Sequence, residues 1–228
     1  MVRAGAESLG LTLPALRMLR GCLPAPRVLS LGYPDIVAKR SDVRDLFGVD
    51  VESVNDSGLW HSVKFELPET GEFFEKIGSK LDCVDIVASR GVERIVDLNY
   101  PEDLGQYDLV IDGGTIEHCF MAGQAILNAA GAVKPGGRIM HGTPMSMVNH
   151  GFWNVCPTLY YDFYTQNGWE IEAWIGVNRE GSTWSIPETQ RVVIPDEISL
   201  LCVARRLDDS PLRYPTQTKY LANPMLKI

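Results

Sequence analysis

The chain has 228 residues, of which 45% are hydrophobic and 22% charged, and this composition fits a globular domain and excludes collagen-like, coiled-coil and disordered chains. Its formal net charge of −8 disfavours nucleic acid and anionic membranes as partners. The five cysteines are scattered and none forms a C-x-x-C pair, so we expect reduced thiols, a cytoplasmic protein and no metal site.

The first 26 residues are rich in leucine but do not form a continuous apolar run. Glu7, Pro14, Arg17 and Arg20 interrupt the segment. Neither a secretory signal nor a membrane span of ~20 residues fits there. We expect a helical lead-in over residues 1–26 and no membrane partner.

Strand-like and helix-like segments alternate through the middle of the chain, which is typical of a parallel α/β sheet. Strands are predicted over residues 27–31, 81–87, 93–98, 107–112, 138–141, 169–177 and 198–205. Helices are predicted over residues 116–132 and 157–167, the first ending in a Lys-Pro-Gly-Gly turn at residues 134–137.

Two segments lie outside this alternation in what we expect to be a single domain over residues 1–228. Residues 49–80 form an insertion between the first two strands, with one helix around residues 69–77 and a possible role as a lid. Residues 208–228, which are rich in proline and polar residues, are expected to form an arm on the surface or on a second subunit. A homodimer is therefore compatible with the sequence.

Acidic residues and glycines recur where the predicted strands end. In a parallel sheet these positions meet at one edge, where ligands bind. Carboxylates there could accept hydrogen bonds from ribose hydroxyls, and glycines would let a ligand approach the backbone. The alternative is that each acid caps a helix or ends a strand. The positions are Gly32, Asp35, Asp85, Asp97, Asp112, Gly113 and Gly114.

Three runs in order along the chain resemble the class I S-adenosylmethionine-dependent methyltransferases: residues 95–99 (IVDLN), 107–118 (YDLVIDGGTIEH) and 133–139 (VKPGGRI). Residues 149–154 and 157–164 are similar to small-molecule and sugar methyltransferases. The resemblance implies a Rossmann-like, seven-stranded, mostly parallel sheet with helices on both faces and an antiparallel edge hairpin.

The resemblance also implies roles for the strand-end residues, with S-adenosylmethionine as cofactor. Asp85 would lie at the ribose, Asp97 and the Leu98 backbone at the adenine, and Asp112 and Gly113 beside the methionine part. Ile86 and Gly114 are also predicted to bind the cofactor. The first loop departs from the family's G-x-G-x-G turn, since only Gly32 is kept and Pro34 lacks a backbone donor. Asp35 could meet the cofactor's amino group and Tyr33 could stack on a ligand, or Pro34-Asp35 could be a simple turn.

A hydroxyl acceptor needs a base, and His150 and His118 are the predicted catalytic residues. For both, the alternative is a structural, hydrogen-bonded histidine. Glu117, Asn149, Trp153 and Tyr161 are the predicted substrate-binding residues, while Tyr160, Phe163 and Tyr164 form a helical stripe expected in the core. Cys119 is expected to be a buried cysteine rather than a nucleophile.

The predicted function is methyl transfer to a small polar acceptor, a hydroxyl of a sugar or sugar-like natural product, by an O-methyltransferase. The alternative is a methyltransferase-like binding or assembly module that has lost catalysis, because the first loop is altered. The G-x-G-x-x-G turn of dehydrogenases and the phosphate-binding loop of ATPases are absent from the sequence.

Overall fold

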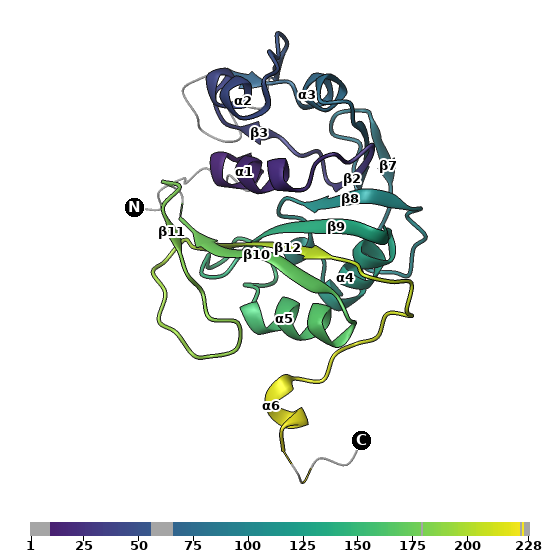
Figure 1. Cartoon of the computed structure of the whole chain (residues 1–228), viewed down its shortest axis with the longest axis vertical. Coiled ribbons are helices and arrows are strands. Elements are labelled where there is room, and N and C mark those ends of the chain that lie inside the picture. The colour runs from purple at the N-terminus through teal and green to yellow at the C-terminus, as the bar shows by residue number, and fades with distance from the viewer. Residues whose placement is uncertain (1–9, 56–65, 179, 224, 226–228) are drawn as a thin grey trace.

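The computed structural model describes residues 10–55, 66–178, 180–223 and 225, and its centre is an eight-stranded sheet (Figure 1). In spatial order the strands are β11 (Thr183–Trp184), β10 (Glu170–Val177), β12 (Ser199–Arg205), β9 (Val133–Pro144), β8 (Tyr107–Asp112), β2 (Arg27–Leu31), β6 (Lys80–Asp85) and β7 (Glu93–Ile95). The five strands from β9 to β7 are parallel, whereas β12 runs antiparallel to both β9 and β10.

This arrangement confirms the predicted mostly parallel sheet with an antiparallel pair towards one edge. The number of strands differs from the prediction. The two-residue strand β11 pairs antiparallel with the end of β10, so the sheet has eight strands rather than seven.

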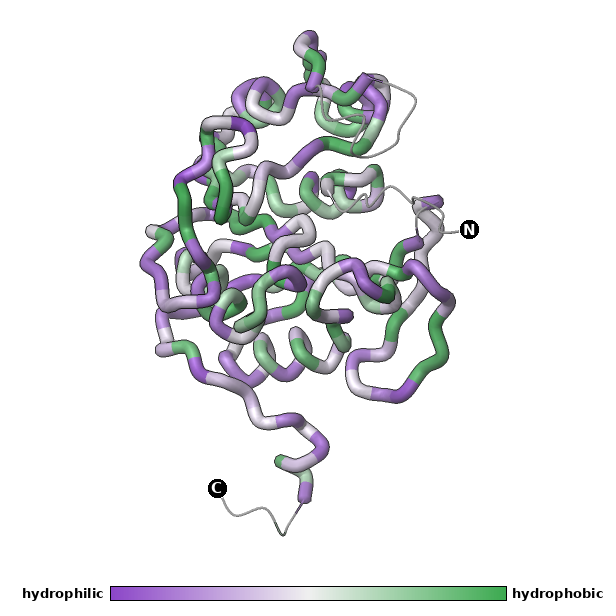
Figure 2. The backbone as a smooth tube through the Cα atoms, turned by 180° about the vertical axis from the view of Figure 1, so that it is seen from behind, coloured by the Kyte–Doolittle hydropathy of each residue, from purple (hydrophilic) through white to green (hydrophobic). Residues whose placement is uncertain are grey.

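Helices cover both faces of the sheet, as predicted. They are α1 (Leu13–Gly21), α2 (Arg40–Phe47), α3 (Thr70–Lys76), α4 (Ala122–Gly131), α5 (Pro157–Gln166) and the short α6 (Thr218–Leu221). In Figure 1, α1 to α3 lie on one side of the sheet and α4 and α5 on the other. Strand β8 serves both cores, because Leu109 and Ile111 pack on the α1 side and Val110 packs on the α4 side. Figure 2 shows the hydrophobic residues gathered along the inner elements, while the C-terminal segment is mostly hydrophilic.

The N-terminal segment is part of the core rather than a separate lead-in. Strand β1 (Leu11–Thr12) pairs in parallel with β3 (Ile36–Val37), and Leu16 and Leu19 of α1 are fully buried. Residues 1–9 of the predicted lead-in lie outside the described residues.

The insertion contains the predicted helix as α3. Glu69 caps this helix, accepting a 2.6 Å hydrogen bond from the Glu72 N–H. Before it, β4 (Val54–Asn55) and β5 (Leu67–Pro68) form an antiparallel pair. Residues 56–65 lie outside the described residues.

Two predicted segments have a different local structure. The predicted helix over residues 116–132 is divided into a 3-10 turn, η2 (Ile116–His118), and α4, because Cys119 is extended and the Asn99 side chain accepts a 2.9 Å hydrogen bond from the Met121 N–H. The predicted turn at residues 134–137 is a bulge within β9, where Gly136 has φ +82° and the pairing with β8 shifts register.

The C-terminal arm lies on its own chain, over α5. Asn167 accepts a hydrogen bond from the Arg213 N–H at 2.9 Å, Gln166 accepts one from the Thr216 N–H at 2.9 Å, and Asp162 accepts one from the Thr218 N–H at 3.0 Å. Among the described helices, none combines the length and apolar character that crossing a membrane requires.

Candidate functional site

A cavity of about 220 Å³ lies where β2, β6 and β8 end. These strands are parallel and adjacent, so the turns that follow them converge at one edge of the sheet. The cavity, called the cradle below, is lined by Gly10, Leu31, Gly32, Tyr33, Pro34, Asp35, Asp85, Ser89, Arg90, Gly113, Gly114 and Thr115. The predicted strand-end positions Gly32, Tyr33, Asp35, Asp85, Gly113 and Gly114 therefore meet in one place.

Gly32 allows the close packing at the bottom of the cradle. Its φ is +73°, a left-handed conformation, and a Cβ there would lie 3.1 Å from Thr115 Oγ1 and 3.6 Å from Asp85 Oδ2. Thr115 Oγ1 also donates a 2.7 Å hydrogen bond to the Leu31 carbonyl. The turns after β2 and β8 are thus joined directly, and any side chain at position 32 would force them apart.

Asp35 is held by two neighbours. The Arg90 guanidinium donates to both carboxylate oxygens at 3.1 and 3.0 Å, and Asn55 Nδ2 donates to Oδ1 at 2.6 Å. Arg90 also lies over the Tyr33 ring, 5.5 Å from its centroid, and the Tyr33 hydroxyl donates to Glu69. The cradle therefore contains a cation and an anion side by side, and Arg90 is a residue that the sequence analysis missed.

Asp112 does not reach the cradle. Its side chain is fully buried, with Oδ2 2.8 Å from His141 Nδ1, and His141 Nε2 lies 2.6 Å from the Tyr164 hydroxyl. Asp112 Oδ1 accepts hydrogen bonds from the Thr115 and Ile116 N–H groups at 3.0 and 3.3 Å. In place of the predicted contact with the cofactor, the Asp112 carboxylate stabilises the turn after β8, whose residues Gly113, Gly114 and Thr115 line the cradle.

The other predicted cofactor residues, which follow β6 and β7 in the chain, are not among the residues that line the cradle. Asp97 Oδ1 accepts hydrogen bonds from the Asn99 N–H at 3.0 Å and from its Nδ2 at 2.8 Å, in a local turn after β7. Leu98 is buried, and Ile86 is 64% exposed just after β6.

Cys119 lies among these acids. Burial, together with the nearby carboxylates of Asp112 and Asp97, raises the pKa of its thiol to about 12. The thiol is therefore protonated at neutral pH, as expected of a buried cysteine rather than a nucleophile.

A second group of polar side chains follows the cradle along the chain. Glu117, His118 and His150 present ligand-type atoms that all lie within 4.8 Å of one another. Glu117 is fully buried, His118 is exposed, and the two imidazole centroids are 5.1 Å apart. Burial raises the pKa of Glu117 to about 7, opposed by the adjacent His150. The two predicted catalytic histidines and Glu117 thus form one cluster.

Backbone contacts hold this cluster together. The N–H groups of Phe152 and Trp153 both point to the Glu117 carbonyl, at 2.9 and 3.3 Å. A Cβ at Gly151 would lie only 2.8 Å from that carbonyl oxygen, so only glycine fits this approach. Asn149, with φ +64°, is exposed at the turn into this segment.

Exposed aromatic residues lie around the cluster. Phe120 and Phe152 are each 66% exposed and pack edge to face at 5.7 Å, and Trp153 is 45% exposed with its Nε1 donating to the Cys119 carbonyl at 3.1 Å. Tyr161 lies elsewhere, on α5, and is half-buried. The stripe formed by Tyr160, Phe163 and Tyr164 is in the core, as predicted.

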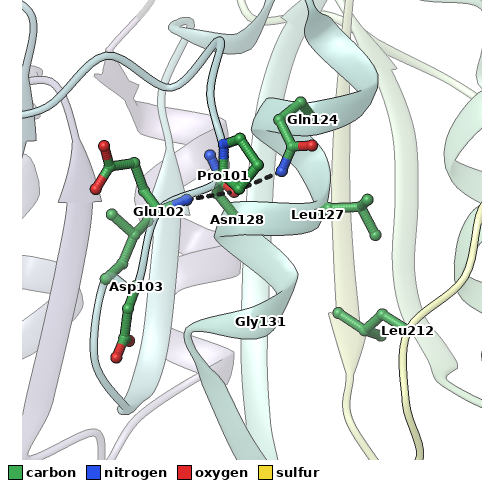
Figure 3. Close-up of a pocket in the computed structure, with 9 residues that line it drawn as sticks. Pro101, Glu102, Asp103, Gln124, Leu127, Asn128, Gly131 and Leu212 are labelled. Carbon is green, nitrogen blue, oxygen red and sulfur yellow. Dashed lines mark hydrogen bonds between the residues drawn. The ribbon is translucent and has the colours of Figure 1, made fainter.

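A larger cavity of about 460 Å³ lies beside α4, away from the cradle (Figure 3). At its wall, Asn128 Oδ1 accepts hydrogen bonds from Gln124 Nε2 at 2.8 Å and from the Glu102 N–H at 3.2 Å. Asn128 Nδ2 donates to the carbonyls of Leu98 and Tyr100. Asn128 therefore fixes the segment after Asp97, a role that no sequence motif indicated.

No protein-family model and no curated protein matches this chain. Among solved structures, it is similar to the N-methyltransferase NodS from Bradyrhizobium japonicum WM9 in complex with S-adenosylhomocysteine, at 14% identity and a TM-score of 0.48 over 86% of this chain and 84% of that one. It is also similar to the Burkholderia thailandensis 1,6-didemethyltoxoflavin-N1-methyltransferase, at 15% identity and a TM-score of 0.46 over 86% of this chain and 77% of that one. A third similar structure is an O-methyltransferase family protein from Burkholderia thailandensis. It has 16% identity and a TM-score of 0.40 over 85% of this chain and 55% of that one.

The strand order of the chain itself defines the fold. The strand order carries both features that the motifs imply: a mostly parallel sheet covered by helices on each face, and an antiparallel pair towards one edge. The chain therefore has a Rossmann-like α/β fold.

Proposed function

We propose that this protein transfers a methyl group from S-adenosylmethionine to a small polar acceptor. The observation that carries the proposal is the cradle, which joins two glycine turns and a strand-end carboxylate at the carboxyl edge of a parallel sheet. Glycine backbone permits close approach of a ligand, and Asp85 could accept hydrogen bonds from ribose hydroxyls. Asp97 and Leu98, beyond the cradle wall, are assigned to the adenine.

The charge pair in the cradle suits the amino-acid end of this cofactor. That end carries both an ammonium and a carboxylate group. Asp35 would face the ammonium and Arg90 the carboxylate, each exchanging part of its present ion pair for a ligand contact. Such contacts would offset the backbone donors missing from the altered loop, where Pro34 stands.

For the acceptor we propose a hydroxyl of a sugar or sugar-like natural product. Glu117 and His118 follow the cradle residues in the turn after β8, His150 joins them from the loop after β9, and exposed aromatic rings are their sequence neighbours. Aromatic faces bind sugar rings, and a cluster of imidazoles and a carboxylate can activate a hydroxyl. Asn149 and Trp153 are assigned to acceptor binding. The five free thiols fit a cytoplasmic location.

A binding module without catalysis is the second candidate. It is favoured by the Arg90–Asp35 ion pair, in which each side chain already neutralises the other within the cradle. The two candidates differ in whether the chain binds the cofactor.

The test is thermal unfolding with S-adenosylmethionine and with S-adenosylhomocysteine. A ligand at ~100 times its dissociation constant stabilises the folded state by about 2.7 kcal/mol, so both ligands should raise the melting temperature. Asp97→Ala should abolish this shift without unfolding the chain, whereas Glu102→Ala, an exposed change in the same connection, should keep it. No shift with the unaltered chain at millimolar ligand would favour the binding module.

A further inference from the structure

We propose that Glu117, His118 and His150 form a binding site for a divalent first-row transition-metal cation such as Zn²⁺, Mn²⁺ or Fe²⁺. Glu117 and His118 follow β8 and His150 follows β9, and the exposed aromatic residues Phe120, Phe152 and Trp153 are their neighbours in sequence. The residues of the site are up to 33 positions apart in the sequence, and the fold brings them together.

The distances suit a metal ion. The Glu117 Oε1 and His150 Nε2 atoms are 3.4 Å apart. Two ligands bound tetrahedrally at about 2.1 Å from a zinc ion are separated by about 3.4 Å. The third ligand atom, from His118, lies within 4.8 Å of the others. The His118 side chain is exposed, so a modest rotation can bring it to bonding distance.

The burial of Glu117 is the second observation. Its side chain has no exposed surface, and neither carboxylate oxygen has a hydrogen-bond partner of good geometry among the described residues. Burying a carboxylate is costly unless a cation or donors compensate it. Asp112, the other buried carboxylate of this turn, has three such partners, so the environment of Glu117 is not general to the turn.

The backbone positions these ligands in advance. Close contact between Gly151 and the Glu117 carbonyl fixes the loop that carries His150 against the turn that carries Glu117 and His118. A site whose ligands are already near one another loses little entropy on binding a metal. Two imidazoles and one carboxylate match the preferences of Zn²⁺, Mn²⁺ and Fe²⁺, and three protein ligands leave coordination positions open.

The open positions give the site a role in the proposed function, on which this part of the inference rests. An acceptor hydroxyl bound to the cation becomes more acidic and loses its proton to water. The oxygen lone pair then forms the new bond to the methyl carbon, and the electron pair of the broken carbon–sulfur bond stays on sulfur, which becomes a neutral thioether. The cation would hold the acceptor oxygen in place during this displacement.

The experiment uses the untagged full chain, freed of metal by chelation, and Co²⁺ as a spectroscopic probe. Titration followed by visible absorption should show one bound Co²⁺ per chain. Glu117→Gln and His118→Ala should each weaken binding at least about tenfold. Glu102→Gln, which removes an exposed carboxylate elsewhere, should bind as the unaltered chain does. His118→Ala changes an exposed residue, so its folding, checked by thermal unfolding, should be retained.

Absence of a Co²⁺ absorption band, or Co²⁺ affinities of Glu117→Gln and His118→Ala equal to that of the unaltered chain, would overturn the metal site. S-adenosylhomocysteine binding is measured on the same samples by thermal unfolding. A chain that binds S-adenosylhomocysteine but not Co²⁺ keeps the proposed function and loses the metal site. A chain that binds Co²⁺ through these residues but not S-adenosylhomocysteine keeps the metal site and loses the methyl-transfer role.

Discussion

Replacing His141 by leucine should strongly destabilise the chain, although this residue lies at no surface and in neither cavity. His141 is fully buried between Asp112 and Tyr164, and its ring stacks on Tyr160 with centroids 4.2 Å apart. Leucine fills a similar volume but offers no polar atom. The variant would leave the Asp112 carboxylate without the partner of its Oδ2 and the Tyr164 hydroxyl without its acceptor.

The expected magnitude follows from what remains buried. Removing one partner of a buried ionic or polar pair costs about 3–5 kcal/mol, because the other group stays desolvated. Tyr164→Phe removes only the outer hydroxyl and leaves one imidazole nitrogen unsatisfied, which costs about 1–3 kcal/mol. With a total stability on the order of 5–15 kcal/mol for a native domain, both variants should still fold at low temperature.

The assay is urea unfolding followed by circular dichroism, with the free energy of unfolding obtained by linear extrapolation. Combining His141→Leu with Asp112→Asn should cost less than the sum of the two single changes, since the neutral amide removes the unpaired charge. A loss below about 1 kcal/mol for His141→Leu, or strict additivity of the pair, would refute the view that the histidine compensates a buried carboxylate.

Three further outcomes are expected. Gly32→Ala should lower the free energy of unfolding by about 1 kcal/mol and weaken S-adenosylhomocysteine binding, because φ is +73° there and the new Cβ would lie 3.1 Å from Thr115 Oγ1. Gly78→Ala, which is strained but in open space, should lower stability without changing binding; urea unfolding measures the stability and calorimetry the binding. Iodoacetamide at pH 8 should label one thiol rapidly, that of the exposed Cys156, and mass spectrometry of Cys156→Ser should show no fast phase. Asn128→Leu should weaken binding of the cofactor more than Gln124→Leu, because only Asn128 donates to the Leu98 and Tyr100 carbonyls; equal calorimetric affinities would contradict this role.

Much of the sheet was predictable because its central strands are buried on both faces. The bounds of β2 and β8 match the prediction, since each is a short apolar run followed by glycine. The short helix α2 was not predicted. Its apolar stripe consists of only Val43, Leu46 and Phe47, a single helical turn among polar residues, which is too short to indicate a helix on its own. The break between η2 and α4 depends on Asn99, a contact from 22 residues away that local patterns do not contain.

The cradle was predicted in outline, but the direction of each side chain at a strand end was not. Side chains alternate along a strand, so Asp112 faces the same side as Val110, which packs in the α4 and α5 core. The register of β8 and β9 pairs Asp112 with His141, and neighbours in register point to the same face. The buried Asp112–His141 contact can be derived once this register is known. The sequence does not contain the register, and the position of Asp112 at a strand end alone suggests contact with a ligand.

The cluster of Glu117, His118 and His150 shows a different limit. Sequence searches for metal sites rely on ligands at short, regular spacing, and here two ligands are adjacent while the third is 32 residues away. Adjacent residues in an extended or helical segment point in different directions, but the 3-10 turn η2 and the exposed position of His118 let both reach one point. The feature that brings His150 to them is Gly151, whose missing side chain allows its loop to touch the Glu117 carbonyl. A glycine next to a histidine is common in sequences, and only the packing of the two turns gives this one its role.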